Sequence, residues 1–101
     1  MKMRLAWIAD HEYSDSYAAK ETRVILKALA RNQEIVAMWL ALGSTEPPHH
    51  WHGIRVFPIP SECLASKEFL VTLIHQLRPH VIVSNFPHAA YPAGMEYLSD
   101  G

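Results

Sequence analysis

The opening stretch of the chain limits its possible folds more than any other. Met3 to Ala9 is a nearly continuous apolar run, which is typical of a strand buried on both faces of a sheet. A polar, turn-forming segment from Asp10 to Ser16 follows at once, and a helical pattern begins directly after it. Strand, polar loop and helix form the first unit of an open α/β sheet, and such sheets bind ligands at the carboxyl ends of their strands. We therefore expect residues 10–17 to line any binding site.

The residues from Ala18 to Arg31 predict an amphipathic helix. Apolar side chains fall on one face of this segment, and basic side chains fall on the other. Ser14, Asp15 or Ser16 can serve as the N-cap, because each offers a side-chain oxygen to the free amides of the first turn.

Two further apolar runs, residues 34–42 and 54–59, predict a second and a third strand. Pro58 and Pro60 have no amide hydrogen for a sheet ladder, so the third strand is expected at or near a sheet edge. Residues 45–53 lie between these runs and contain two prolines and three histidines (TEPPHHWHG), which predicts a loop.

The helical pattern returns over residues 64–77, with Ser61 or Ser66 as the expected cap, and an Arg-Pro pair ends it. Residues 80–83 (HVIV) predict a buried fourth strand, and residues 93–98 a short helix.

The predicted fold class is α/β, with the order strand, helix, strand, strand, helix, strand. Right-handed crossovers then give an open, Rossmann-like parallel sheet of four strands, in the spatial order third, second, first, fourth, flanked by helices. The first strand is central in this arrangement. No repeat, linker or low-complexity segment interrupts the chain, so residues 1–101 are expected to form a single domain.

Composition excludes several classes of partner and location. Nine basic and ten acidic side chains give a net charge of -1 and are not gathered into runs, so we expect no nucleic acid partner. Cys63 is the single cysteine, which precludes an intrachain disulfide and favours a reducing compartment. The sequence has neither a signal-peptide pattern nor the run of about 18 apolar residues that a transmembrane segment needs. We expect a cytoplasmic location.

Three histidines, His49, His50 and His52, surround Trp51. Imidazoles bind zinc or nickel, but a site needs three or four ligands in a fixed geometry, which near-adjacent residues on a proline-rich loop rarely provide. We predict no metal and no other cofactor. Trp51 is expected to pack this loop onto the sheet edge, with sugar stacking as the alternative.

Four features together resemble the amino-terminal domain of family 4 glycosyltransferases, enzymes of the two-domain GT-B architecture. The first is the hydrophobic opening strand with its polar loop and the helix RVILKALARNQEIV, and the second is the segment WHGIRVFP that leads into the third strand. The third is the segment from Leu73-Ile74 through RPHVIV that leads into the fourth strand, and the fourth is the spacing between these motifs. The resemblance spans roughly residues 3–86.

The chain departs from the family pattern in two respects. The family usually has glycines in the loop after the first strand, where this chain has Ser16-Tyr17-Ala18-Ala19. The family's carboxy-terminal domain, which binds the nucleotide-sugar donor, has no counterpart here. We therefore expect either a fragment of a longer protein or a half-domain that works with a partner or as a homodimer.

The resemblance implies an acceptor-side domain, which in a complete enzyme holds a small-molecule or glycan acceptor for sugar transfer. Asp10 and His11 are the candidate catalytic residues, as a general base or as a hydrogen-bond partner of the acceptor hydroxyl. Their alternative roles are bonding loop amides and facing solvent. The candidate acceptor-binding residues are Ser14, Ser16, Tyr17, Ser84, Asn85 and His88. The last three, which follow the fourth predicted strand, could instead cap a turn. The alternative function is a non-catalytic α/β module that dimerises or docks on a partner.

Overall fold

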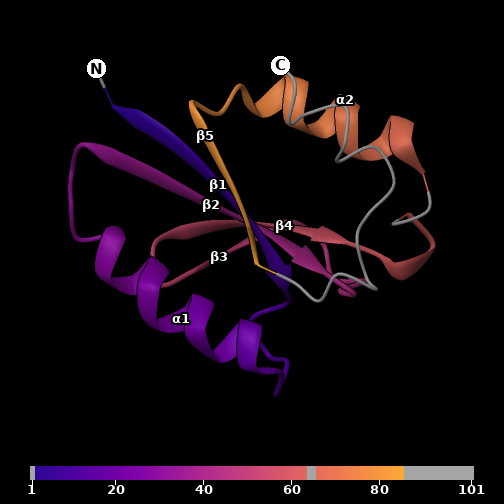
Figure 1. Ribbon diagram of the computed structural model, residues 1–101, viewed down its shortest axis with the longest axis horizontal. Helices are drawn as coiled ribbons and strands as arrows, with labels where there is room; N and C mark the ends of the chain where they lie inside the picture. The colour runs from indigo at the N-terminus through magenta and orange to yellow at the C-terminus, as the bar shows by residue number, and fades with distance from the viewer. Residues whose placement is uncertain (1, 64–65, 86–101) are drawn as a thin grey trace.

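The computed structural model describes residues 2–63 and 66–85, and these form an α/β arrangement of two α-helices on a five-stranded mixed sheet (Figure 1). The elements in chain order are β1 (Met3–Asp10), α1 (Tyr17–Leu29), β2 (Ile35–Leu42), β3 (His49–Trp51), β4 (Ile54–Ile59), the 3-10 turn η1 (Ser61–Cys63), α2 (Lys67–Leu77) and β5 (Val81–Asn85). The helix expected over residues 93–98 lies outside the described residues.

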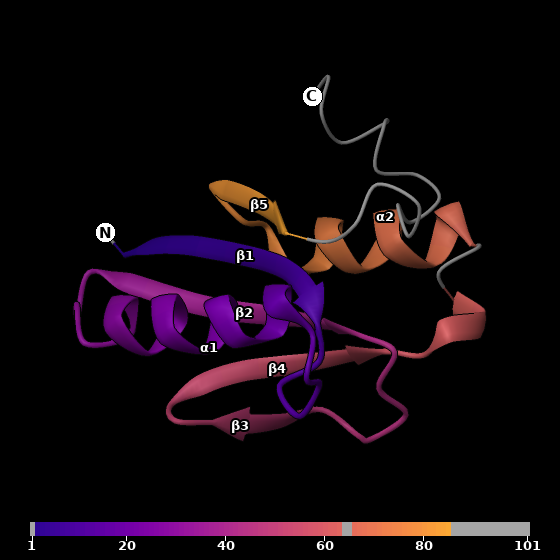
Figure 2. The same ribbon diagram turned by 60° about the horizontal axis from the view of Figure 1, so that its bottom comes forward.

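The order of the four predicted strands is confirmed. The full sheet has the order β3-β4-β2-β1-β5, in which β1 is parallel to both β2 and β5, and β2 is parallel to β4. The first strand thus lies inside the sheet with a neighbour on each side, although β2 is the middle strand of the five. Figure 2 shows β3 and β5 at the two opposite edges.

The prediction of a purely parallel, four-stranded sheet is wrong, because part of the expected loop at residues 45–53 is a strand. His49–Trp51 form β3, which pairs antiparallel with β4. The two strands are joined by His52 and Gly53, both in the left-handed region with φ of 50° and 79°. Two consecutive positive φ angles match the twist of a two-residue hairpin. The sequence did not predict this turn, because His-Gly is not among the usual hairpin dipeptides.

The two helices cover opposite faces of the sheet (Figure 1). On one face, Leu26 of α1 packs in a cluster with Trp7 and Trp39, which are register partners on β1 and β2. On the other face, Leu70 of α2 packs in a cluster with Ile8. Successive residues of β1 therefore enter different cores, which accounts for the continuous apolar run in its sequence.

Serine side chains begin both helices. Ser16 Oγ accepts a hydrogen bond from the Ala19 amide (3.1 Å), and Ser66 Oγ accepts one from the Phe69 amide (3.2 Å). These are two of the N-caps that the sequence offered as alternatives. Within the described residues, neither helix has the length and apolar character to cross a membrane.

The buried hydrogen bond between β1 and α1 gives a test of this packing. The Trp7 indole N–H donates to Thr22 Oγ1 at 3.0 Å, and Thr22 Oγ1 in turn donates to the Ala18 carbonyl. Thr22→Val preserves the shape of the side chain but leaves the buried indole N–H without an acceptor. We expect it to lower the free energy of unfolding in urea by about 1–3 kcal/mol.

The matched control for this substitution is Val24→Thr, on the exposed surface of the same helix. It makes the reverse change between two β-branched residues and should alter the free energy of unfolding by less than about 0.5 kcal/mol. Equal effects of the two variants would contradict the assigned role of Thr22.

Candidate functional site

The loops that follow β1 and β2 meet at the carboxyl edge of the parallel strands. The His11 amide donates to the carbonyl of Leu42, the last residue of β2, at 3.1 Å. The His11 ring lies beside Gly43, where a Cβ would stand 3.8 Å from its Cδ2 atom, and Gly43 has a φ of 82°. A glycine suits this position because the backbone is left-handed there. The edge where ligands bind in open α/β sheets is thus formed by two neighbouring loops.

Asp10 and His11 both lie at this edge, as predicted. Asp10 is the half-buried last residue of β1. His11 Nδ1 accepts a hydrogen bond from the Tyr13 amide at 3.2 Å, so in the neutral ring the proton is on Nε2. Within residues 2–63 and 66–85, neither the Asp10 carboxylate nor His11 Nε2 has a hydrogen-bond partner. Their proposed catalytic roles stay predictions.

The three other candidates in this loop differ in their surroundings. Ser16 caps α1, and Ser14 Oγ accepts a hydrogen bond from the Ser16 amide at 3.1 Å. Both hydroxyl oxygens therefore accept bonds from the backbone, while each O–H remains a possible donor. Tyr17, the first residue of α1, is 79% exposed. Their roles in acceptor binding stay predictions.

The candidates after the fourth predicted strand are also separated by the structure. Asn85 ends β5, and its amide nitrogen donates to Glu21 Oε1 of α1 at 2.9 Å. Ser84 is exposed. His88 lies outside the described residues. Asn85 therefore connects the end of β5 to the helix that follows the β1 loop.

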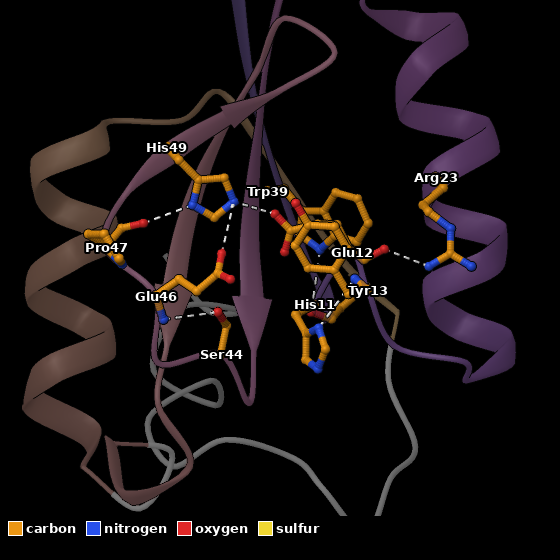
Figure 3. Close-up of polar contacts among 10 residues, drawn as sticks. His11, Glu12, Tyr13, Arg23, Trp39, Ser44, Glu46, Pro47 and His49 are labelled. Carbon is orange, nitrogen blue, oxygen red and sulfur yellow. Dashed lines mark hydrogen bonds and ion pairs between the residues drawn. The ribbon is translucent and has the colours of Figure 1, made fainter.

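A buried carboxylate–imidazole pair, not singled out from the sequence, lies beside these residues. The Glu12 side chain is fully buried, and its Oε2 atom is 2.5 Å from His49 Nε2 (Figure 3). Glu12 belongs to the loop after β1, whereas His49 begins β3 at the far edge of the sheet. The contact therefore joins two segments 37 residues apart. Within the described residues, the second oxygen, Oε1, is buried without a hydrogen-bond partner.

The surroundings of His49 favour its charged form. The Pro47 carbonyl lies 2.8 Å from Nδ1, and Glu46 Oε2 lies 3.9 Å from Nε2 (Figure 3). The hydrogen bond to Pro47, then the bond to Glu12, and finally the charges of Glu12 and Glu46 raise the pKa of His49 above its usual value, against partial burial of the ring. An imidazolium donates from both nitrogens and can satisfy both close acceptors.

Arg23 of α1 anchors the loop that carries Glu12. One terminal nitrogen of its guanidinium donates to the Glu12 carbonyl at 2.7 Å (Figure 3). The same nitrogen donates to the Ser14 carbonyl at 2.9 Å. Charged donors make the stronger hydrogen bonds in proteins. The loop is thus held on one side by α1 and on the other by β3.

The imidazoles of His49, His50 and His52 do not form a cluster. His50 is the exposed residue of β3, and His52 lies in the hairpin turn. Within the described residues, no group of three or more potential metal ligands lies together. Trp51 packs edge-on against Trp39 with ring centroids 5.5 Å apart, as expected for a residue that closes this segment onto the sheet.

Comparison with known proteins adds no identification. No family model, no curated protein and no solved structure matches this chain.

The anchoring role of Arg23 can be tested directly. Arg23→Ala removes the donor from two loop carbonyls, and we expect the free energy of unfolding to fall by about 1–3 kcal/mol. Hydrogen exchange should quicken at the amides of residues 11–16 in particular. Lys20→Ala, at an exposed position of the same helix, is the matched control. Similar exchange of these amides in both variants would argue against the anchor.

Proposed function

We propose that the carboxyl edge of the sheet binds a hydroxyl-rich small molecule, and that the chain acts as the acceptor-side domain of a glycosyltransferase-like enzyme. One observation carries the proposal. β1 lies inside the parallel part of the sheet and ends at Asp10 and His11, where the loops after β1 and β2 converge. Two polar side chains at this edge suit a ligand that offers hydroxyl groups.

The hydrogen bond at His11 Nδ1 assigns different catalytic roles to His11 and Asp10. With Nδ1 occupied by the Tyr13 amide, neutral His11 presents Nε2–H, which can donate to the oxygen of an acceptor hydroxyl. Asp10 then serves as the base. The acceptor oxygen bonds to the anomeric carbon of the donor sugar, the bond from that carbon to the nucleotide phosphate breaks, and the hydroxyl proton passes to Asp10. The phosphate oxygen takes the bonding electron pair and departs with the nucleotide.

The strand order also supports the proposal, because the resemblance to family 4 glycosyltransferases implies a parallel α/β core with the acceptor at these loops. The nucleotide-sugar donor belongs on a second domain or a homodimer partner. Accordingly, we propose a small-molecule or glycan acceptor and no nucleic acid partner. The single cysteine supports a cytoplasmic location for this chemistry.

The first test is a titration of the ¹⁵N-labelled chain with neutral monosaccharides such as glucose, galactose, mannose and N-acetylglucosamine. We expect amide shifts at residues 10–16 and 43–46 with at least one sugar. His11→Ala removes one neutral hydrogen bond and should raise the Kd about 2- to 10-fold. His75→Ala, an exposed histidine on α2, should leave the Kd unchanged.

Two results would count against the proposal. Shifts confined to other parts of the chain would move the site away from the carboxyl edge. An unchanged Kd in His11→Ala would remove His11 from acceptor binding, and Asp10→Asn would then decide whether the edge contributes at all.

The second candidate function is a non-catalytic module that dimerises or docks on a partner. It is favoured by two exposed apolar residues, Tyr17 and Val24, which are seven positions apart and share one side of α1. Sedimentation of the same sample separates the candidates. A dimer without sugar-dependent shifts would support the module, and Val24→Lys should then dissociate it.

A further inference from the structure

The Glu12–His49 pair joins two segments at the carboxyl edge. Glu12 is in the loop after β1, and His49 begins a strand of only three residues that is bonded to the sheet through β4 alone among the described elements. Short edge strands with a single neighbour belong to the less stable parts of a fold. The pair therefore lies where a small free-energy change can separate two segments.

We propose that Glu12 and His49 form a pH-sensitive clasp. The clasp holds the β1–α1 loop against β3 while the pair shares one proton, and it releases the loop when that proton is lost. This role is independent of the acceptor-binding function proposed above. It depends on the contacts of the pair and not on any ligand.

The requirement for a proton follows from the donors and acceptors present. His49 Nδ1 faces the Pro47 carbonyl and Nε2 faces the Glu12 carboxylate, so both ring nitrogens meet acceptors. A neutral imidazole has one N–H and cannot donate to both, whereas an imidazolium can. If the proton sits on the Glu12 oxygen instead, the carboxyl donates to Nε2 and both contacts still persist. Either way the closed clasp contains one more proton than a carboxylate with a neutral ring.

Loss of that proton is costly because of burial. The Glu12 side chain is fully buried and its Oε1 atom already lacks a partner within the described residues. A neutral ring with its N–H on Nε2 still reaches Glu12, but it leaves the buried carboxylate without a counter-charge and turns the Nδ1 lone pair toward the Pro47 carbonyl. With the N–H on Nδ1, neither carboxylate oxygen has a hydrogen bond from the described residues. Exposure of Glu12 to water relieves this penalty, and it requires the loop and β3 to separate.

The charged groups around His49 agree with this direction. Glu12 faces the ring from the β1–α1 loop and Glu46 from the β2–β3 loop, and Val56, its register partner on β4, carries no charge. The guanidinium of Arg23 on α1 bonds to backbone carbonyls of the loop that carries Glu12. Two carboxylates thus favour the protonated ring.

The sign of the pH dependence follows from the raised pKa of His49. A histidine whose pKa is higher in the folded state adds stability that is fully present below about 6.5, its unfolded value. That stability disappears as the pH rises through the folded pKa. The clasp is therefore closed at acidic pH and opens on the alkaline side. Beyond the midpoint, a one-proton release lowers the closed-to-open ratio about tenfold per pH unit.

NMR of the full chain between pH 5 and 9 tests the clasp. The His49 ring resonances report protonation, and the amides of residues 12–14 and 49–51 report the contact. We expect the ring and both amide groups to change together, with one midpoint above 6.5. Hydrogen exchange at Trp51, corrected for the intrinsic effect of pH, should lose protection over the same interval.

Glu12→Gln is the decisive variant, because its side-chain amide donates to a neutral Nε2 and needs no extra proton. We expect the amides of residues 12–14 to lose their dependence on His49 protonation, and the His49 midpoint to fall. His50→Gln, which removes the exposed neighbouring imidazole of β3, should preserve the wild-type profile.

Three outcomes would overturn the clasp. One is a His49 titration that the amides of residues 12–14 do not follow. Another is an unchanged midpoint in Glu12→Gln, and the third is loss of the coupled transition in His50→Gln. If Glu12→Gln fails to fold, the wild-type comparison of ring and amide midpoints still decides the proposal.

Discussion

The structure depends on β1 being paired along both of its edges and buried on both of its faces. Hydrogen bonds to β2 and β5 occupy its backbone, and its side chains alternate between the cores under α1 and α2. The middle of the strand, residues 5–9, is buried throughout, so its polar residues appear only near its two ends. That constraint brings Asp10 and His11 to the sheet edge and directs the following loop outward.

The loop after β1 is fixed by two side chains that approach from opposite sides. Arg23 holds its carbonyls from α1, and His49 holds the Glu12 carboxylate from β3. A carboxylate this deeply buried is tolerated only with a close partner. The hairpin of β3 and β4 thus contributes to the site by positioning His49, although it lies at the far edge of the sheet.

The proposed ligand binding and the proposed proton release involve adjacent but different residues of one loop. His11 faces the loop after β2, whereas Glu12, the next residue, faces β3. Opening of the Glu12–His49 contact would free one side of the loop while Arg23 continues to hold the other. A ligand at Asp10 and His11 would then meet a less ordered edge. The two proposals are thus linked through a short segment of backbone, while each stands on its own contacts.

Local patterns in the sequence were sufficient for most of the fold. The apolar run of β1, the amphipathic helices with their serine caps, and the handedness of parallel crossovers together specified four strands and their order, because each reflects a local or topological rule. The same rules placed Asp10 and His11 at the carboxyl edge. Only the tertiary structure decided that residues 49–51 form an antiparallel strand, and that Glu12 is buried against His49. A glutamate in a polar loop looks solvated in sequence, and its burial depends on a partner 37 residues away that arrives only when the sheet has formed.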